Sequence, residues 1–218
     1  MNYNHFLDNS FLPKLIDENA LIAGVDEVGR GALFGSVVAA VIVLPASSLS
    51  KLSDLGVKDS KQLSAKKRQQ VSQLIQVMAT DWQIASASVA EIDRLNIFHA
   101  SLLAMKRAVI GLKVSPVLCL VDGKFPIPEL SIEQKTIVQG DRCSALIAAA
   151  SILAKVWRDE LIVNLANDYP EYDLVNNKGY PTNKHRLALR QYGLSLYHRT
   201  SFRPCQLEKK AFHEESSS

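Results

Sequence analysis

Continuous apolar stretches alternate along this chain with segments whose apolar residues recur every three or four positions. The continuous stretches predict five strands, over residues 21–28, 36–44, 82–89, 117–122 and 135–139. The helical spacing predicts four helices, over about residues 64–79, 96–112, 144–165 and 182–192. Val37 to Leu44 contains no polar residue, which favours a strand buried on both faces. Strands followed by alternating helices and strands indicate an α/β fold with a mixed, five-stranded central sheet.

The helix boundaries have recognisable capping signals. Asn96 is a candidate N-cap, and Gly193 is a candidate C-cap for the last helix. For the helix at 64–79, the inward face is predicted to be Val71, Leu74, Ile75 and Met78. For the helix at 144–165, it is predicted to be Leu146, Leu153, Trp157, Leu161 and Leu165.

Acidic residues follow three of the five predicted strands. These residues are Asp26, Asp122 and Asp141. If the three strands are parallel, their carboxylates meet at one edge of the sheet, where ligands of α/β proteins collect. A group of carboxylates binds a hard ion such as Mg²⁺ or Mn²⁺. The alternative for Asp122 is a turn residue, since Asp-Gly is a common turn pair.

Glu27 is the direct neighbour of Asp26. Adjacent strand residues point to opposite faces, so we expect Glu27 to join Asp26 only if the chain has left the pleat by that point. The turn Gly29-Arg30-Gly31 makes such an exit plausible and allows close approach of another backbone. The alternative is that the Asp-Glu pair is only a solvated loop.

Asp159 competes with Asp141 for the third position of the acidic group. A helix rises about 1.5 Å per residue, which places Asp159 roughly 20 Å beyond a helix start near Ser144. Asp141 and Asp159 therefore cannot both serve one metal pair. We assign Asp141 to the site and expect Asp159 to pair with Lys155 on the helix surface.

The composition is that of an ordinary globular enzyme. The 218 residues fit one domain with at most a small appendage, and the net charge of +3 permits nucleic-acid binding without requiring it. The longest apolar run is far shorter than the roughly 18 residues that span a membrane. Three distant cysteines fit neither a disulfide framework nor a zinc site. With no secretory signal at the N-terminus, the expected location is the cytoplasm.

Several motifs resemble the ribonuclease HII family, within the ribonuclease H-like superfamily. They occur in the family's order from about Leu21 to Pro204. The motifs are GVDEVGRG (24–31), KDSKQLS (58–64), VDG (121–123), GD (140–141), IAAASILAKVWRDE (147–160), KGYPT (178–182) and HRTSF (198–202). The resemblance implies an α/β fold of the ribonuclease H type, with a catalytic core over residues 21–170. It also implies a helical C-terminal extension over 171–206. Residues 1–20 are expected to be helical or irregular, and 207–218 to be a disordered tail.

The resemblance also implies the activity. Family members are endonucleases that cleave the RNA strand of RNA–DNA hybrids and nick 5′ to single ribonucleotides in duplex DNA, leaving 3′-hydroxyl and 5′-phosphate ends. The implied cofactor is a pair of divalent ions, Mn²⁺ or Mg²⁺. The implied catalytic and metal-binding residues are Asp26, Glu27, Asp122 and Asp141. The implied substrate-binding residues are Gly29, Arg30, Gly31, Lys61 and the substrate-sensing Tyr180.

The chain departs from the family at Ala32, Phe34 and Ser36, where the family usually has proline, alanine and proline. These changes bear on the stiffness of the glycine turn, and not on the carboxylates. Arg199 is one of several basic residues that could contact phosphates, and only some of them are expected to do so. His185 and His198 are candidate general acids, with a structural role as the alternative.

Two alternatives fit the sequence less well. One is a non-catalytic nucleic-acid-binding domain on the same fold, which four clustered carboxylates argue against because they repel phosphate. The other is the sister type, ribonuclease HIII, which has an extra N-terminal domain; only some 20 residues precede the first strand here. The expected partners are RNA–DNA hybrids and DNA containing ribonucleotides, with no membrane. The chain is expected to be a monomer. No motif for a replication clamp is evident near Phe212.

Overall fold

The structure, a computed structural model, describes residues 8–57 and 63–207. Within these residues the chain forms two compact units. Unit 1 comprises the described parts of Met1–Val28, Val38–Ser86 and Leu102–Val156. Unit 2 comprises the described parts of Gly29–Val37, Ala87–Ser101 and Trp157–Ser218. The predicted domain boundaries remain predictions.

Unit 1 is built on a five-stranded mixed sheet with the order β3-β2-β1-β4-β5. The strands are β1 (Leu21–Val28), β2 (Val37–Pro45), β3 (Asp81–Ala87), β4 (Leu118–Asp122) and β5 (Glu133–Ile137). Strand β1 pairs antiparallel with β2 and parallel with β4, and β4 pairs parallel with β5. The predicted α/β class with a five-stranded mixed sheet is therefore confirmed, as is the parallel direction of β1, β4 and β5.

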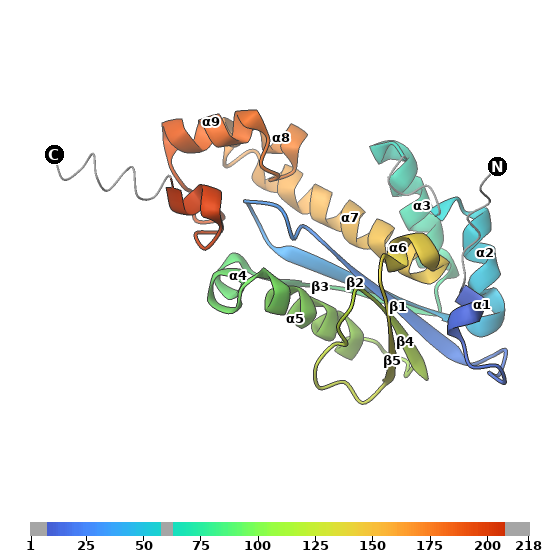
Figure 1. Cartoon of the computed structure of the whole chain (residues 1–218). Coiled ribbons are helices and arrows are strands. Elements are labelled where there is room, and N and C mark those ends of the chain that lie inside the picture. The colour runs from blue at the N-terminus through green and yellow to red at the C-terminus, as the bar shows by residue number, and fades with distance from the viewer. Residues whose placement is uncertain (1–7, 58–62, 208–218) are drawn as a thin grey trace. The chain divides into compact units, whose positions relative to one another are not determined.

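The helices of unit 1 cover both faces of this sheet. Figure 1 shows α7 on one face and α5 on the other. The helices that lie wholly or partly in unit 1 are α1 (Asp8–Phe11), η1 (Ala46–Ser48), α2 (Leu49–Asp54), α3 (Ala65–Met78), α5 (Ile97–Ile110), α6 (Gly140–Cys143) and α7 (Ala145–Leu165). Helix α3 starts at Ser64, whose side chain accepts a hydrogen bond from the backbone of Lys67, as expected for an N-cap.

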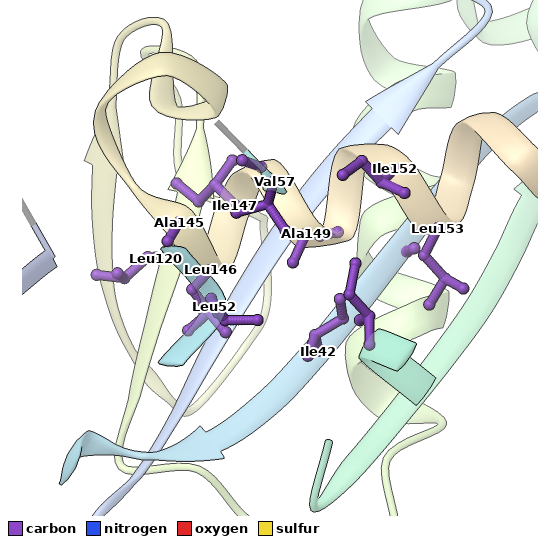
Figure 2. Close-up of a cluster of buried hydrophobic side chains, with 14 of the residues drawn as sticks. Ile42, Leu52, Val57, Leu120, Ala145, Leu146, Ile147, Ala149, Ile152 and Leu153 are labelled. Atoms are coloured by element: carbon purple, nitrogen blue, oxygen red, sulfur yellow. The ribbon is translucent and has the colours of Figure 1, made fainter. Parts of the chain in front are cut away.

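The main core lies between α7 and the sheet. Figure 2 shows side chains of α7, including Leu146, Ala149 and Leu153, gathered with Ile42 of β2 and Leu120 of β4. The run from Ala145 to Ala150 is buried on every side, because small residues let α7 approach the strands closely. A Cβ atom at Gly24 of β1 would lie 2.6 Å from Leu146 Cγ, so this glycine permits the contact.

Unit 2 has a smaller core of its own. Its helices are α4 (Val89–Leu95), the start of α5, the end of α7, η3 (Pro170–Tyr172), α8 (Leu174–Asn177) and α9 (Asn183–Tyr192). The fully buried ring of Phe34 lies in this core, 5.6 Å from the ring of Tyr169 and 5.1 Å from that of His198. Phe34, one of the positions at which the sequence departs from the resembled family, is a central packing residue of unit 2.

Two buried arginines link the segments of unit 2 through backbone carbonyls. Arg158 donates to the carbonyls of Phe34 (3.0 Å), Ser36 (3.2 Å) and Lys178 (2.9 Å). Arg199 donates to the carbonyls of Gly35 (2.9 Å) and Arg30 (3.0 Å). Both side chains are fully buried. Of the candidate phosphate-contacting residues, Arg199 is therefore excluded, because its guanidinium is buried and bonded inside the protein.

Several predictions about the helices need correction. Leu74 was expected to face inward but is 51% exposed, and Ser72 is buried in its place. Trp157 of α7 is also exposed. Residues 89–95 continue beyond β3 as helix α4, with a capping box at Ser88 and Glu91, and residues 49–54 form α2; neither helix was predicted. The caps Asn96 and Gly193 are confirmed.

No helix in the described ranges is long and apolar enough to cross a membrane. The three cysteines, all within these ranges, are free thiols.

Candidate active site

Asp26 projects from β1 toward α7. Alternate residues of the strand, Ile22 and Gly24, lie against α7, and Asp26 continues this face. Its carboxylate accepts hydrogen bonds from the Ser151 side chain of α7 and from the backbone N–H of Glu27 at 2.7 Å. The side chain is only 5% exposed. Asp26 is thus held by the sheet and the helix together.

Asp122 lies at the end of β4, next to β1. The last parallel pair of this ladder joins Val25 to Val121, so Asp26 and Asp122 follow at equivalent positions on neighbouring strands. Both carboxylates therefore belong to the same face and the same edge of the sheet. Asp122 Oδ1 accepts a hydrogen bond from the backbone N–H of Gly140 at 2.6 Å, which orients the carboxylate.

Glu27 joins these two aspartates. One ligand atom from each of Asp26, Glu27 and Asp122 lies within 4.8 Å of the others. The expectation that this requires the chain to leave the pleat is wrong, since β1 continues to Val28 and Glu27 still pairs with Ala39 of β2. The ladder with β4 ends at Val25, however, so Glu27 lies beyond that ladder. We attribute the approach to its longer side chain, which can reach around the strand there.

The electrostatics of this group suit a cation. Burial, together with the negative charges of Glu27 and Asp122, raises the pKa of Asp26 well above its ordinary value. Burial and the charge of Asp141 raise the pKa of Asp122, although the N–H of Gly140 opposes the rise. The three carboxylates offer only oxygen ligands, and their negative charges repel one another. Such a group fits Mg²⁺ or Mn²⁺ and lacks the sulfur and nitrogen ligands that zinc prefers.

Asp141 lies beside Asp122 but in a different local structure from the one expected. Strand β5 ends at Ile137, Gln139 adopts a left-handed conformation (φ 54°), and Asp141 is in the first turn of the short helix α6. Its negative charge acts on Asp122, which places it next to the acidic group, although it is not one of the three residues with ligand atoms within 4.8 Å. Asp159, the rejected competitor, belongs to the part of α7 in unit 2.

The glycine turn belongs to unit 2. Gly29 has φ 92°, a conformation that favours glycine, and a Cβ atom there would lie 2.2 Å from Arg158 Nε. A Cβ atom at Gly31, by contrast, would have no described atom within 4 Å apart from its own chain neighbours. Gly29 is therefore required by the fold, whereas the space beside Gly31 is open for another molecule.

Tyr180 is held close to the segment that follows this turn. The carbonyl of Gly179 accepts hydrogen bonds from the N–H groups of Leu33 (2.8 Å) and Phe34 (3.3 Å). The guanidinium carbon of Arg158 lies 5.3 Å from the centre of the Tyr180 ring, within the range of a cation–π contact. The two predicted substrate-binding segments are therefore neighbours within unit 2. Lys61 lies outside the described residues.

Sequence reasoning missed the residues that support the site. Ser151 and Gly140 hold the two aspartates, and Arg158 packs against Gly29 and the ring of Tyr180. The signal for Arg158 was a single arginine within a long, otherwise largely apolar helix. Such a residue is seldom buried unless it has several acceptors.

Comparison with known proteins identifies the family of the chain. The family model for ribonuclease HII matches residues 23–205. The chain is 56% identical to ribonuclease HII from Trichormus variabilis over 207 residues, which cover 95% of this chain and 91% of the relative. It is 60% identical to ribonuclease HII from Microcystis aeruginosa over 188 residues, 85% of this chain and 89% of the relative.

Solved structures show the same fold. Ribonuclease H2 from Pyrococcus horikoshii OT3 matches with a TM-score of 0.78 and 26% identity, covering 89% of this chain and 99% of that chain. A ribonuclease HIII structure matches with a TM-score of 0.69 and 18% identity, over 90% of this chain and 71% of that chain, which shows a shared fold alone. The predicted ribonuclease H-like fold is thus confirmed. With a family match over most of its length and relatives at 51–60% identity, the chain belongs to the ribonuclease HII family.

Proposed function

We propose that this nuclease is a metal-dependent endonuclease that cleaves the RNA strand of RNA–DNA hybrids and nicks 5′ to single ribonucleotides in duplex DNA. Membership of the ribonuclease HII family supports a ribonuclease H endonuclease. The observation that supports the metal dependence is the convergence of Asp26, Glu27 and Asp122 within 4.8 Å at the end of two parallel strands.

In this proposal Asp26, Glu27 and Asp122 hold divalent ions, Mg²⁺ or Mn²⁺, and Asp141 is a further ligand. When bound, such ions neutralise charge on the scissile phosphate and activate water. The protein's own contribution is to fix the carboxylates. Ser151 and the N–H of Gly140 orient two of them, so that they do not have to reorganise on binding. Burial and mutual repulsion raise the pKa values of Asp26 and Asp122, so without cations we expect the ionised cluster to cost stability.

Recognition of the ribonucleotide is assigned to unit 2. Telling RNA from DNA requires a contact with the 2′-hydroxyl. We assign this contact to the peptide groups of Gly29-Arg30-Gly31, supported by the open space at Gly31. Tyr180 would stack on the deoxyribose that follows the ribonucleotide, with its hydroxyl bonded to the 2′-oxygen. In the chain, only Val28 separates Glu27 from Gly29. Lys61 is proposed to lie near the scissile phosphate.

The partners in this proposal are nucleic acids. A ribonuclease HII from Archaeoglobus fulgidus, 25% identical to this chain, was solved in a complex with PCNA. Phe212, near which no clamp-binding motif was evident, lies outside the described residues, so a similar partner is not proposed for this chain. The free state of Cys119, Cys143 and Cys205 is consistent with the proposed cytoplasmic location.

The proposal is tested with an end-labelled DNA duplex that contains one ribonucleotide, with an all-DNA duplex as the control. Cleavage 5′ to the ribonucleotide is expected with Mg²⁺ or Mn²⁺ and should stop on addition of EDTA. Asp26→Asn should be inactive under the same conditions. Cleavage that persists in EDTA would overturn the metal-dependent mechanism. Tight binding without turnover in both metals would favour a non-catalytic nucleic-acid-binding domain.

A further inference from the structure

The backbone carbonyl of Tyr180 is held by a buried histidine. It accepts a hydrogen bond from Nδ1 of His185 at 3.0 Å and a second from the N–H of Thr182 at 2.8 Å. His185 lies in the first turn of α9, where Thr182 is the N-cap and accepts from the N–H of His185. The side chain of His185 is completely buried. The start of α9 and the residue proposed to sense the substrate are thus joined directly.

A second buried histidine continues this connection. Nε2 of His185 lies 3.0 Å from Nε2 of His198, and Nδ1 of His198 accepts from the N–H of Ser195 at 2.9 Å. A backbone N–H can only donate, so we assign Nδ1 of His198 as the acceptor and its Nε2 as the donor; the Ser195 hydroxyl, 2.9 Å from the same Nδ1, can donate to it as well. A backbone carbonyl can only accept, so Nδ1 of His185 has a proton. The hydrogen bonds therefore run in one direction, from Ser195 through both rings to Tyr180.

The surroundings keep both rings neutral. His198 is 1% exposed, and the centre of its ring lies 4.6 Å from that of Tyr172 and 5.1 Å from that of Phe34. Burial lowers the pKa of His198 to about 3, with a further contribution from His185. Burial also lowers the pKa of His185, although the Tyr180 carbonyl and the charge of Asp173 oppose this. A proton added to either ring would place two N–H groups against each other and break the series of hydrogen bonds.

We propose that His185, aligned by His198, is a positioning residue that fixes the backbone of Tyr180 for substrate recognition. The inference rests on the proposed role of Tyr180. The histidine pair is too deeply buried to act as a general acid. Its role is also more than core packing. The reason is the end point of the hydrogen bonds: the acceptor is the carbonyl that joins Tyr180 to Pro181, and Pro181 already restricts this backbone. With Arg158 against the ring, Tyr180 is held at both its backbone and its side chain.

The test is a double-mutant cycle on the duplex with one ribonucleotide. His185→Phe retains an aromatic ring but removes the donor to Tyr180, and we expect kcat/KM to fall about 10-fold. His185→Asn places an amide N–H near the position of Nδ1 and should restore most of this loss. In a Tyr180→Ala background, His185→Phe should cause little further loss, because there is no longer a ring to position.

Tyr172→Phe is the matched control. It removes a buried hydrogen bond from the Tyr172 hydroxyl to the carbonyl of Gly193, in the same core and in contact with both histidine rings. It leaves the hydrogen bond from His185 to the Tyr180 carbonyl in place, so its effect on kcat/KM should be small. If Tyr172→Phe lowers kcat/KM as much as His185→Phe does, core packing explains the result and the inference fails.

The remaining outcomes separate the two proposals. If Tyr180→Ala keeps full activity, the role of Tyr180 is wrong and the inference falls with it. If Tyr180→Ala loses activity but His185→Phe costs the same in both backgrounds, only the inference is overturned. Should His185→Phe fail to fold, imidazole ¹⁵N NMR of the unmodified protein decides. It should show the proton on Nδ1 of His185 and on Nε2 of His198, and any other pair of tautomers would overturn the inference.

Discussion

The N–H of Gly140 donates to Asp122 Oδ1 at 2.6 Å, and this contact connects the end of β4 to the start of α6. A Cβ atom at Gly140 would lie 3.0 Å from Asp122 Oδ1 and 2.6 Å from Ile147 Cδ1. Gly140 therefore supplies both a donor and the space for the carboxylate. Because Asp141 follows in the same helix, one short segment orients Asp122 and contributes a second charge beside it.

Gly140→Ala should consequently reduce both stability and activity. The end of the Ile147 side chain can move, so we expect a loss of about 1–3 kcal/mol in the free energy of unfolding. Asp122 must also shift, and a misplaced ligand should lower kcat/KM by about 10- to 100-fold. Steady-state kinetics and urea unfolding measure the two effects. Gly111→Ala is the control, since a Cβ there makes its nearest contact at 3.3 Å, far from the acidic group in sequence. Equal activity in both variants would contradict the role given to Gly140.

Asp26→Asn should remove activity and yet stabilise the protein without metal. The raised pKa of Asp26 means that its ionised form is disfavoured in the folded state, so an amide relieves this cost at neutral pH. The melting temperature in EDTA should rise by about 2–4 °C for each kcal/mol gained. Mg²⁺ or Mn²⁺ should then raise the melting temperature of the unmodified protein more than that of the variant. A lower melting temperature for Asp26→Asn in EDTA would show that the carboxylate serves the fold.

The predictable part of the fold was the part governed by local pattern. Strand β1, the cap Asn96 and the helix starts near Ser64 and Thr182 follow from apolar runs and side-chain chemistry that act within a few residues. Leu74 shows the limit of this approach, since helical spacing alone does not say how wide the buried face is. Helix α4 was missed because its seven residues are too few for a clear periodicity.

For the acidic site, the sequence predicts which strand ends carry the carboxylates, but not the contacts that hold them. Parallel strands bring Asp26 and Asp122 to one edge, which follows from topology. The supporting contacts depend on residues distant in sequence. Asp8, for example, accepts from the N–H of Ala145 at 2.8 Å and from the Ser144 hydroxyl, at the start of α7. Nothing near Asp8 in the sequence indicates this partner, because the contact exists only once the sheet and α7 have packed.

The two glycines of the recognition turn should behave differently. In Gly29→Ala, the alanine must adopt a positive φ and its Cβ overlaps the Arg158 side chain. We therefore expect a loss of about 2–4 kcal/mol in the free energy of unfolding. Gly31→Ala meets open space and should change stability by less than about 0.5 kcal/mol. Its methyl group should nevertheless obstruct the 2′-hydroxyl and reduce cleavage. Thermal unfolding and kcat/KM on the same samples measure both quantities. Full activity in Gly31→Ala would place the 2′-hydroxyl elsewhere.

Substitutions at Tyr180 separate stacking from hydrogen bonding. Loss of an aromatic stacking partner costs about 1–3 kcal/mol, which corresponds to roughly 5- to 150-fold in kcat/KM for Tyr180→Ala. Tyr180→Phe retains the ring and its contact with Arg158, so its loss should be smaller. Single-turnover cleavage of the duplex with one ribonucleotide provides the comparison. Equal losses in the two variants would make the hydroxyl the main contributor.

The neutral histidine pair should make unit 2 sensitive to acid. In the unfolded chain both histidines titrate near pH 6.5, whereas the folded pKa of His198 is about 3 and that of His185 is also lowered. Between these values the unfolded state binds more protons, so the free energy of unfolding falls as the pH falls, by at most about 1.4 kcal/mol per pH unit for each histidine. Asp26 and Asp122 act in the opposite direction, because their raised pKa values make the folded state bind protons first.

A variant isolates the contribution of His198 to this pH dependence. His198→Gln retains an N–H group for His185 but cannot titrate. Its free energy of unfolding should therefore depend less steeply on pH, and the difference from the unmodified protein should shrink from pH 7 to pH 4. Denaturant unfolding in EDTA over this range measures both curves, with the carboxylates unchanged between them. Parallel curves would mean that His198 is protonated equally in the folded and unfolded states, and would contradict its lowered pKa.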